Sequence, residues 1–234
     1  MKRRLKITLT IVISLLLIIT AGFFIYVSNY YHAEEVALAV MKNGKNLEVQ
    51  DDYIVLSPSS PSDTGMIFYP GGKVEHLAYL PMMEKITAQT GITTILVKMP
   101  FNLAVFGASK ADQVIEQFPD LTDWYIGGHS LGGAMASDYA SKNQTKVDGL
   151  ILMGAYIYGD YPSDRTLTIY GTLETDVSQE IDYTDNVVAI EGGNHAQFGH
   201  YGKQKGDPDA TISREQQQKI TTDAIDQFLV NRED

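Results

Sequence analysis

Short apolar runs and longer amphipathic stretches alternate from residue 53 to the end of the chain. The apolar runs are rich in Ile, Val, Leu or Tyr, which is typical of strands buried on both faces of a parallel sheet. Strands that alternate with helices fold into a mostly parallel central sheet with helices on both faces. We therefore predict an α/β domain over residues 51–234, with strands at residues 53–56, 66–69, 93–99, 124–127, 149–153, 166–170 and 187–191.

The stretches between these strands have the pattern of helices near residues 78–90, 109–118, 131–143 and 213–231. Ser213 is in position to cap the last of them, whose apolar stripe comprises Ile220, Ala224, Ile225, Phe228 and Leu229. Residues 28–50 are predicted to be a connecting region, in which residues 34–41 have the composition of a short helix.

The N-terminal segment differs from the rest of the chain. An uncharged run from Ile7 to Val27 follows the basic residues Lys2, Arg3, Arg4 and Lys6. A helix of about 20 apolar residues crosses the ~30 Å hydrocarbon core of a bilayer. The alternative is a cleaved signal peptide, whose apolar region usually has only about 7–15 residues. We expect residues 1–27 to be an uncleaved transmembrane helix, with the N-terminus in the cytoplasm and the catalytic domain outside the cell membrane.

Charge and the absence of cysteine exclude several classes of function. The formal net charge is −11, and the part after the apolar run is more acidic still, because four basic residues precede that run. Such a surface repels nucleic acid and anionic lipid head groups, so we expect no nucleic-acid partner. Without cysteine there is no disulfide, thiolate zinc site or cysteine nucleophile. An exported protein of this kind fits a bacterial envelope.

The sequence Gly-His-Ser-Leu-Gly-Gly at residues 128–133 lies between a predicted strand and a predicted helix. In that context Gly-x-Ser-x-Gly forms a nucleophile elbow, since the glycines allow a sharp turn and hold the serine hydroxyl above the sheet edge. A glycine-rich turn with a capping serine is the simpler alternative. We predict that Ser130 is a nucleophile.

A serine hydroxyl needs a base to remove its proton. Of the five histidines, His32 adjoins the apolar run, His76 follows the second strand and His129 belongs to the elbow. His195 follows the last predicted strand and precedes the final helix, so it can reach across the strand ends, and we predict that it is the base. We expect His200 to line the pocket wall or lie at the surface. No carboxylate or cysteine completes a ligand set with these two histidines, so we expect no metal.

A carboxylate must orient the imidazole and stabilise its charged form. It should follow the strand at residues 166–170, where Glu174 and Asp176 are both candidates and either can instead be a turn residue in solvent. We favour Glu174 and keep Asp176 as the alternate acid. Either one gives the chain order Ser130, acid, His195.

The oxyanion that forms on attack needs two backbone N–H donors. Leu131, which follows the nucleophile, supplies one. The second is expected from the glycine pair after the strand at residues 66–69, where we favour Gly72 with Gly71 as alternate. A structural turn would explain this glycine pair about as well.

The elbow, the Pro-Gly-Gly loop at residues 70–72 and Gly-Gly-Asn-His at residues 192–195 resemble the α/β-hydrolase superfamily. The longer strings at residues 69–75 and 192–199 resemble a bacterial branch similar to dienelactone hydrolases. The resemblance covers about residues 50–232 and implies an esterase or related acyl hydrolase that needs no cofactor. Such proteins more often carry Asp where Glu174 stands, so a turn one residue longer would bring Asp176 to the histidine.

No long insertion interrupts the predicted domain, and residues 155–164 are only a loop, so a large lid domain is not expected. A small open site suits short or soluble acyl substrates. Residues 99–106 either wall the pocket or pack as a loop. The alternative functions are an acyltransferase acting on a cell-envelope hydroxyl and a catalytically silent, tethered binding module. The presence of serine, histidine, acid and glycines argues against the silent module.

Overall fold

The computed structural model describes residues 2–233, which form two compact units, Met1–Tyr30 and Tyr31–Asp234. The first unit contains helix α1 (Lys2–Ser28), and the apolar N-terminal helix is thereby confirmed. Among the described residues, α1 is the one helix long and apolar enough to cross a membrane, with a mean hydropathy of 2.6. Its length and composition fit a membrane span and a signal sequence alike.

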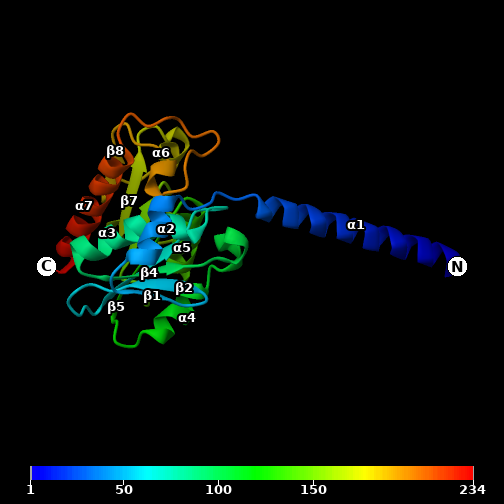
Figure 1. Cartoon of the computed structure of the whole chain (residues 1–234), viewed down its shortest axis with the longest axis horizontal. Helices are drawn as coiled ribbons and strands as arrows, with labels where there is room; N and C mark the ends of the chain where they lie inside the picture. Colours follow the sequence, from blue (N-terminus) through cyan, green and yellow to red (C-terminus); the bar gives the residue numbers. More distant parts are fainter. Residues whose placement is uncertain (1, 234) are drawn as a thin grey trace. The chain divides into compact units, whose positions relative to one another are not determined.

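The second unit is built on an eight-stranded sheet with the strand order β1-β2-β4-β3-β5-β6-β7-β8 (Figure 1). Strands β3 to β8 run parallel, whereas β1 and β2 are antiparallel to their neighbours, which confirms a mostly parallel sheet. The strands are β1 (Leu47–Val49), β2 (Tyr53–Leu56), β3 (Thr64–Tyr69), β4 (Thr93–Val97), β5 (Asp123–His129), β6 (Gly149–Met153), β7 (Thr166–Gly171) and β8 (Val187–Ile190).

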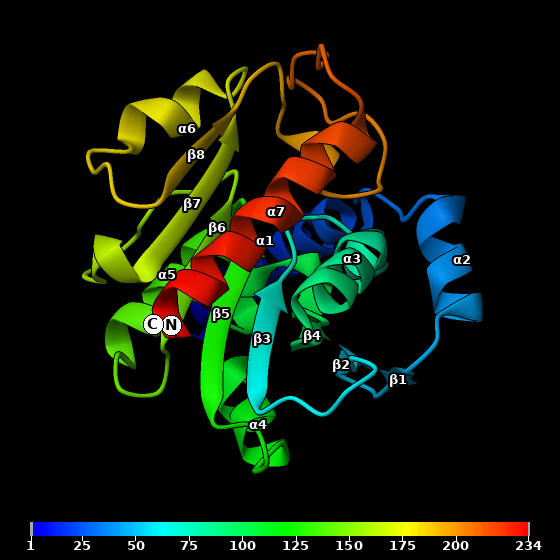
Figure 2. The same ribbon diagram turned by 90° about the vertical axis from the view of Figure 1, so that its left-hand side faces the viewer.

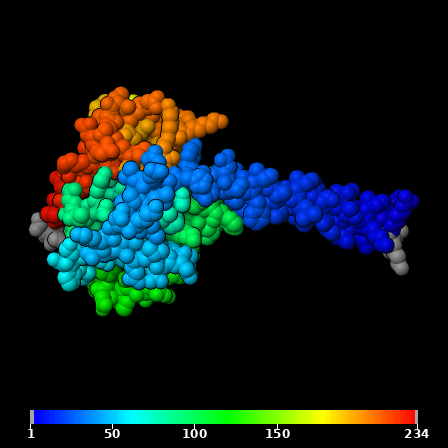
Figure 3. Space-filling view, in the orientation of Figure 1, coloured from blue at the N-terminus to red at the C-terminus, as the bar shows by residue number. Residues whose placement is uncertain are grey.

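Helices cover both faces of this sheet, as predicted. They are α2 (Glu35–Asn43), α3 (Leu80–Thr90), α4 (Lys110–Gln117), α5 (Leu131–Lys142), α6 (Thr175–Glu180) and α7 (Arg214–Glu233). Figure 2 looks onto the face where α7 and α3 cross the sheet, and α2 packs beside α3 there. Figure 3 shows α2 in blue at the surface, next to α3. Helices α4 and α5 contribute to the core on the opposite face.

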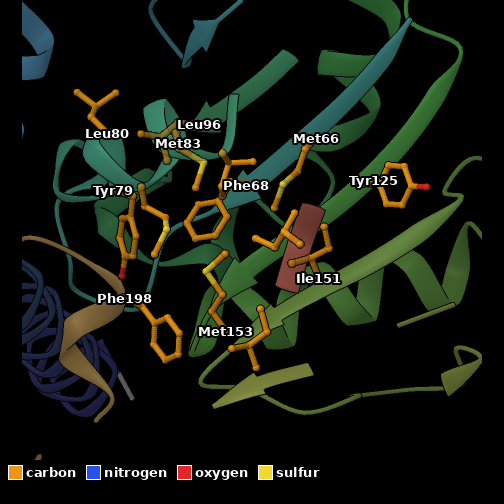
Figure 4. Close-up of a cluster of buried hydrophobic side chains, with 14 of the residues drawn as sticks. Met66, Phe68, Tyr79, Leu80, Met83, Leu96, Tyr125, Ile151, Met153 and Phe198 are labelled. Atoms are coloured by element: carbon orange, nitrogen blue, oxygen red, sulfur yellow. The ribbon is translucent and has the colours of Figure 1, made fainter. Parts of the chain in front are cut away.

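Each face of the sheet has its own hydrophobic core, because successive side chains of a strand point to opposite faces. Along β3, Met66 and Phe68 join one core, while Ile67 and Tyr69 join the other. Figure 4 shows Phe68 in the first core near Met153, with Tyr79 and Phe198 at one side. All of these side chains are buried, and burial of each contributes about 1.5–3 kcal/mol to folding.

The region predicted as a connection, residues 28–50, holds the short helix expected near residues 34–41 and one strand that was not expected. It contains α2 and β1, and Leu47 of β1 pairs with Leu56 of β2 at the edge of the sheet. A strand of three residues is too short for a visible hydrophobic period. The cap of the last helix is present, since Ser213 Oγ accepts a hydrogen bond of 3.2 Å from Gln216 N–H. No large lid separates β6 from β7.

Candidate active site

Ser130 lies in a strained turn between β5 and α5. Its backbone has φ 53° and ψ −124°, a conformation that a residue with a side chain adopts only when its surroundings enforce it. The turn is fixed by hydrogen bonds from Ser130 N–H to Met153 O (3.0 Å) and from Ala134 N–H to Ser130 O (3.0 Å). Gly132 allows this geometry, because a Cβ atom there would lie 2.1 Å from Tyr69 O. The sequence therefore forms the expected elbow.

His195 and Glu174 are joined across the same edge of the sheet. His195 follows β8, Glu174 follows β7, and His195 Nδ1 lies 2.6 Å from Glu174 Oε2. The other carboxylate oxygen accepts a hydrogen bond of 2.7 Å from Gly171 N–H. The Glu174 side chain is 3% exposed and that of His195 15%, so little water screens their interaction. In this arrangement, a buried carboxylate fixes the orientation of the imidazole.

The two candidate acids are separated by the start of helix α6. Thr175 begins this helix, so Asp176 falls in its first turn and is exposed to solvent. Glu174, by contrast, is buried against His195. Of the two, the structure brings Glu174 to the imidazole and leaves Asp176 outside.

A ring contact places His195 beside the elbow. The His195 ring centroid lies 4.4 Å from that of His129, the residue before Ser130. Because Nδ1 of His195 is engaged with Glu174, Nε2 is the nitrogen left to act on a neighbouring group. Ser130, Glu174 and His195 thus follow the carboxyl ends of β5, β7 and β8, with the His195 ring beside the residue that precedes Ser130.

The glycine loop after β3 reaches the start of helix α5. A Cβ atom at Gly72 would lie 2.9 Å from Leu131 Cδ2, so these two residues are in close contact. Leu131 N–H is one of the unpaired donors in the first turn of α5. Gly71 N–H, in contrast, donates to the Tyr79 hydroxyl at 3.1 Å. Gly72 and Leu131 remain the candidate pair of oxyanion donors, because the N–H group of Gly71 already donates to the Tyr79 hydroxyl.

Two residues that sequence reasoning missed hold the His195–Glu174 pair in place. Gly154, at φ +53°, lies under the pair, since a Cβ atom there would be 2.8 Å from Glu174 Oε2 and 2.9 Å from His195 Nδ1. Asp207 accepts hydrogen bonds from His195 N–H (3.1 Å) and Ala196 N–H (2.8 Å). The position of Gly154, directly after the predicted strand at residues 149–153, was a usable signal. Nothing in the sequence near Asp207 indicates its role.

The other two histidines near the site are buried. His200 is 5% exposed, so of the two positions expected for it, pocket wall or surface, the surface position was wrong. His200 Nε2–H donates to Gln218 Oε1 at 3.2 Å, and Arg214 donates to Nδ1 at 3.1 Å. Burial and the neighbouring Arg214 lower the pKa of His200. No group of three or more metal-ligating side chains gathers anywhere in residues 2–233.

A cavity of about 380 Å³ lies beside the His195–Glu174 pair. The loop at residues 204–208 and the start of α6 form its other walls, including Lys205, Asp207 and Asp176. The segment at residues 99–106 touches the glycine loop on another side, where Lys73 N–H donates to Asn102 O at 2.7 Å. The rings of Phe101 and Phe106 in this segment pack edge to face with centroids 5.7 Å apart.

A family model described as the alpha/beta hydrolase family matches residues 65–219. No curated protein sequence matches the chain. Est1E from Butyrivibrio proteoclasticus, solved with ferulic acid bound, has a TM-score of 0.55 and 14% identity, covering 77% of this chain and 94% of Est1E. A carboxylesterase from Mesorhizobium loti has a TM-score of 0.50 and 15% identity, covering 80% and 99%. Carboxyl esterase 2 from Tuber melanosporum has a TM-score of 0.52 and 11% identity, covering 76% and 82%.

Because the sequence identities are low, these three similarities show a shared fold and nothing more. The family match covers the elbow, both candidate acids and His195. The superfamily predicted from the motifs is thereby confirmed. The narrower resemblance to dienelactone hydrolases stays a prediction.

Proposed function

Because the chain belongs to the α/β-hydrolase family, we propose that it hydrolyses carboxylic esters or related acyl substrates through an acyl-enzyme on Ser130. In this proposal His195 is the general base, Glu174 orients it, and Leu131 and Gly72 supply the oxyanion hole. The observation that carries the proposal is the 2.6 Å contact between His195 Nδ1 and buried Glu174, beside the strained elbow.

The proposed reaction uses His195 first as a base and then as an acid. His195 Nε2 accepts the hydroxyl proton of Ser130 while Oγ attacks the carbonyl carbon of the substrate. Glu174 remains ionised and stabilises the imidazolium. The N–H groups of Leu131 and Gly72 donate to the developing oxyanion. His195 then protonates the leaving alcohol. In the second half, His195 takes a proton from a water molecule that attacks the acyl group, and it returns this proton to Ser130 Oγ as the acid leaves.

Short or soluble acyl substrates are the proposed class. One feature supports it: no lid domain lies between β6 and β7. The solved structures of similar fold include proteins described as carboxylesterases, which favours an ester bond as the bond that is cleaved.

Labelling with a fluorophosphonate probe tests the nucleophile. The wild-type protein should be labelled and should hydrolyse a panel of p-nitrophenyl esters of graded acyl length, fastest with the short acyl groups. Ser130→Ala should abolish both activities and keep the circular dichroism spectrum of the wild type. Labelling that persists in Ser130→Ala would refute the assignment, and an unlabelled wild-type protein would favour the silent binding module. Acyl transfer to an added polyol faster than hydrolysis would favour the acyltransferase.

We also propose that α1 remains attached as an anchor, with the catalytic unit outside the cytoplasm. The apolar length of α1 and the basic residues before it support this arrangement. Protease added to intact cells should remove the catalytic unit, and Edman sequencing of the mature protein should begin before Ile7. A mature N-terminus beyond Gly22 would instead identify a cleaved signal peptide.

A further inference from the structure

Tyr79 and His129 form a buried polar pair that the proposed reaction does not use. Their exposed fractions are 0% and 1%, and Tyr79 Oη lies 2.8 Å from His129 Nδ1. Aromatic side chains surround the pair: the Phe68 ring lies 5.2 Å from that of Tyr79, and the Phe198 ring 5.6 Å from that of His129. Figure 4 shows the Tyr79 hydroxyl on the side of Phe198. Burying polar groups among apolar ones destabilises a fold unless they are paired.

The hydroxyl of Tyr79 and the imidazole of His129 can share one proton in a hydrogen bond. Gly71 N–H donates to Tyr79 Oη at 3.1 Å, and the Tyr79 hydroxyl keeps its own proton, which we assign as the donor to His129 Nδ1. Burial raises the pKa of Tyr79 and lowers the pKa of His129 well below its usual range, which keeps both groups neutral. A neutral imidazole that accepts at Nδ1 carries its proton on Nε2. The chain therefore runs from Gly71 N–H through the Tyr79 hydroxyl to His129.

Both ends of this chain adjoin proposed catalytic groups. Gly71 precedes the oxyanion donor Gly72, and a Cβ atom at Gly71 would lie 2.7 Å from Tyr79 Oη and 2.9 Å from His129 Nδ1. The glycine loop thus rests directly on the pair. At the other end, the His129 ring lies 4.4 Å from that of His195, at an interplanar angle of 43°.

Stability alone does not explain a histidine at residue 129. His129 Nε2 is buried and makes no hydrogen bond of ordinary geometry within residues 2–233, although an interaction with the His195 backbone raises the pKa of His129 against the larger effect of burial. An unpaired polar atom in a protein interior destabilises the fold, whereas an apolar side chain of similar size would not. The histidine instead provides what an apolar residue lacks, an acceptor for the Tyr79 hydroxyl.

We propose that Tyr79 and His129 are positioning residues whose hydrogen bond holds the Gly71–Gly72 loop in register with the His195 ring. The oxyanion donor and the general base are then fixed relative to each other by one rigid pair. This role rests on the function proposed above for Ser130 and His195. A pair that only filled the core would affect stability without affecting the transition state.

Tyr79→Phe tests this role with little change of shape. The loop loses its support, and a displacement of about 1 Å at a catalytic group costs up to about 100-fold in rate. We expect kcat for a short p-nitrophenyl ester to fall about 10- to 100-fold while KM changes less than about twofold. Binding of a trifluoromethyl ketone, which forms an oxyanion on Ser130, should weaken in step with kcat/KM. Binding of the carboxylate product should stay within about twofold.

Tyr161→Phe is the matched control. The Tyr161 hydroxyl is also buried and donates to Val147 O at 3.0 Å, but Val147 precedes β6 and lies at the opposite end of the sheet. Loss of this hydrogen bond should lower the melting temperature to a similar extent and leave kcat within about twofold. A Tyr79→Phe variant that behaves in the same way, with unchanged kcat and ketone affinity, would overturn the proposal.

Variants of His129 supply a second measurement. Asn at this position keeps an acceptor near the place of Nδ1, whereas Leu removes it. We expect His129→Asn to retain most of the kcat that His129→Leu loses. The Tyr79→Phe, His129→Leu double variant should be no slower than about the slower single variant, because both remove the same interaction. Fully additive losses would contradict the shared role.

Different results would refute the proposed function and the positioning role. If fluorophosphonate labelling persists in Ser130→Ala, the function fails. If labelling depends on Ser130 but Tyr79→Phe keeps its kcat and its affinity for the ketone, only the positioning role fails. Where His129→Leu does not fold, Tyr79→Phe and the ketone affinity decide the question.

Discussion

Changing Glu174 to Gln keeps the shape of the side chain and removes its charge. In the structure, the Glu174 carboxylate is buried and lies 2.6 Å from His195 Nδ1. When Ser130 gives up its proton, the imidazole becomes positive, and the two charge centres are then about 4 Å apart. At an effective dielectric constant of about 20, this attraction is worth about 4 kcal/mol.

That energy corresponds to a factor of about 10³ in rate, since each 1.36 kcal/mol is tenfold. A second effect adds to it. Gln presents an N–H group to Nδ1 and so favours the tautomer with its proton on Nε2, which cannot act as a base toward Ser130. In another Ser-His-acid triad, the corresponding carboxylate-to-amide change costs about 10⁴ in kcat. We therefore expect Glu174→Gln to lower kcat by about 10³–10⁴.

The assay is steady-state hydrolysis of one short p-nitrophenyl ester, with active sites counted by the fluorophosphonate probe. Asp176→Asn is the paired control, because Asp176 is an exposed carboxylate two residues away. Its kcat should stay within about tenfold of the parent enzyme. A severe loss in Asp176→Asn beside a nearly normal Glu174→Gln would transfer the role to Asp176. Two mild variants would mean that the triad acid is neither residue.

Three further predictions concern the groups around this pair. His195→Ala should lower kcat by several orders of magnitude, whereas His200→Ala should destabilise the fold and keep kcat within about tenfold. The reverse ranking of kcat would show that the base is misassigned. Gly154→Ala should lower the melting temperature and reduce kcat at least about tenfold, because a side chain at φ +53° is strained by about 1–2 kcal/mol and meets Glu174 Oε2. Asp207→Asn leaves one acceptor oxygen for the two N–H groups of His195 and Ala196, so kcat should fall about tenfold with KM unchanged. An unchanged kcat would mean that Asp207 does not position the base.

The parallel part of the sheet and the positions of Ser130 and His195 were predictable from the sequence. Buried strands have apolar runs that stand out along the chain, and the carboxyl ends of parallel strands meet at one edge. A serine after β5 and a histidine after β8 therefore had to lie at that edge. The short edge strand β1 carries no such pattern, because three residues do not define a period.

The finer features of the site depend on contacts that the local pattern does not encode. Glu174 and Asp176 differ because α6 begins at Thr175, and a helix of six residues without an apolar stripe gives little signal. Gly71 and Gly72 differ because the hydroxyl of Tyr79 takes up one of the two N–H groups. Asp207 approaches His195 from an irregular loop.

The strained backbone at Ser130 has a consequence for evolution. Glycine adopts positive φ angles without the steric cost that a Cβ atom imposes, so selection for stability alone would favour glycine at this position. Under the proposed function, selection for catalysis favours serine there, and the two pressures oppose each other. Descendants of this chain that no longer needed catalysis would be free to exchange serine for glycine at the elbow. A lineage that retains serine at the elbow is therefore one in which selection for a nucleophile has outweighed the gain in stability.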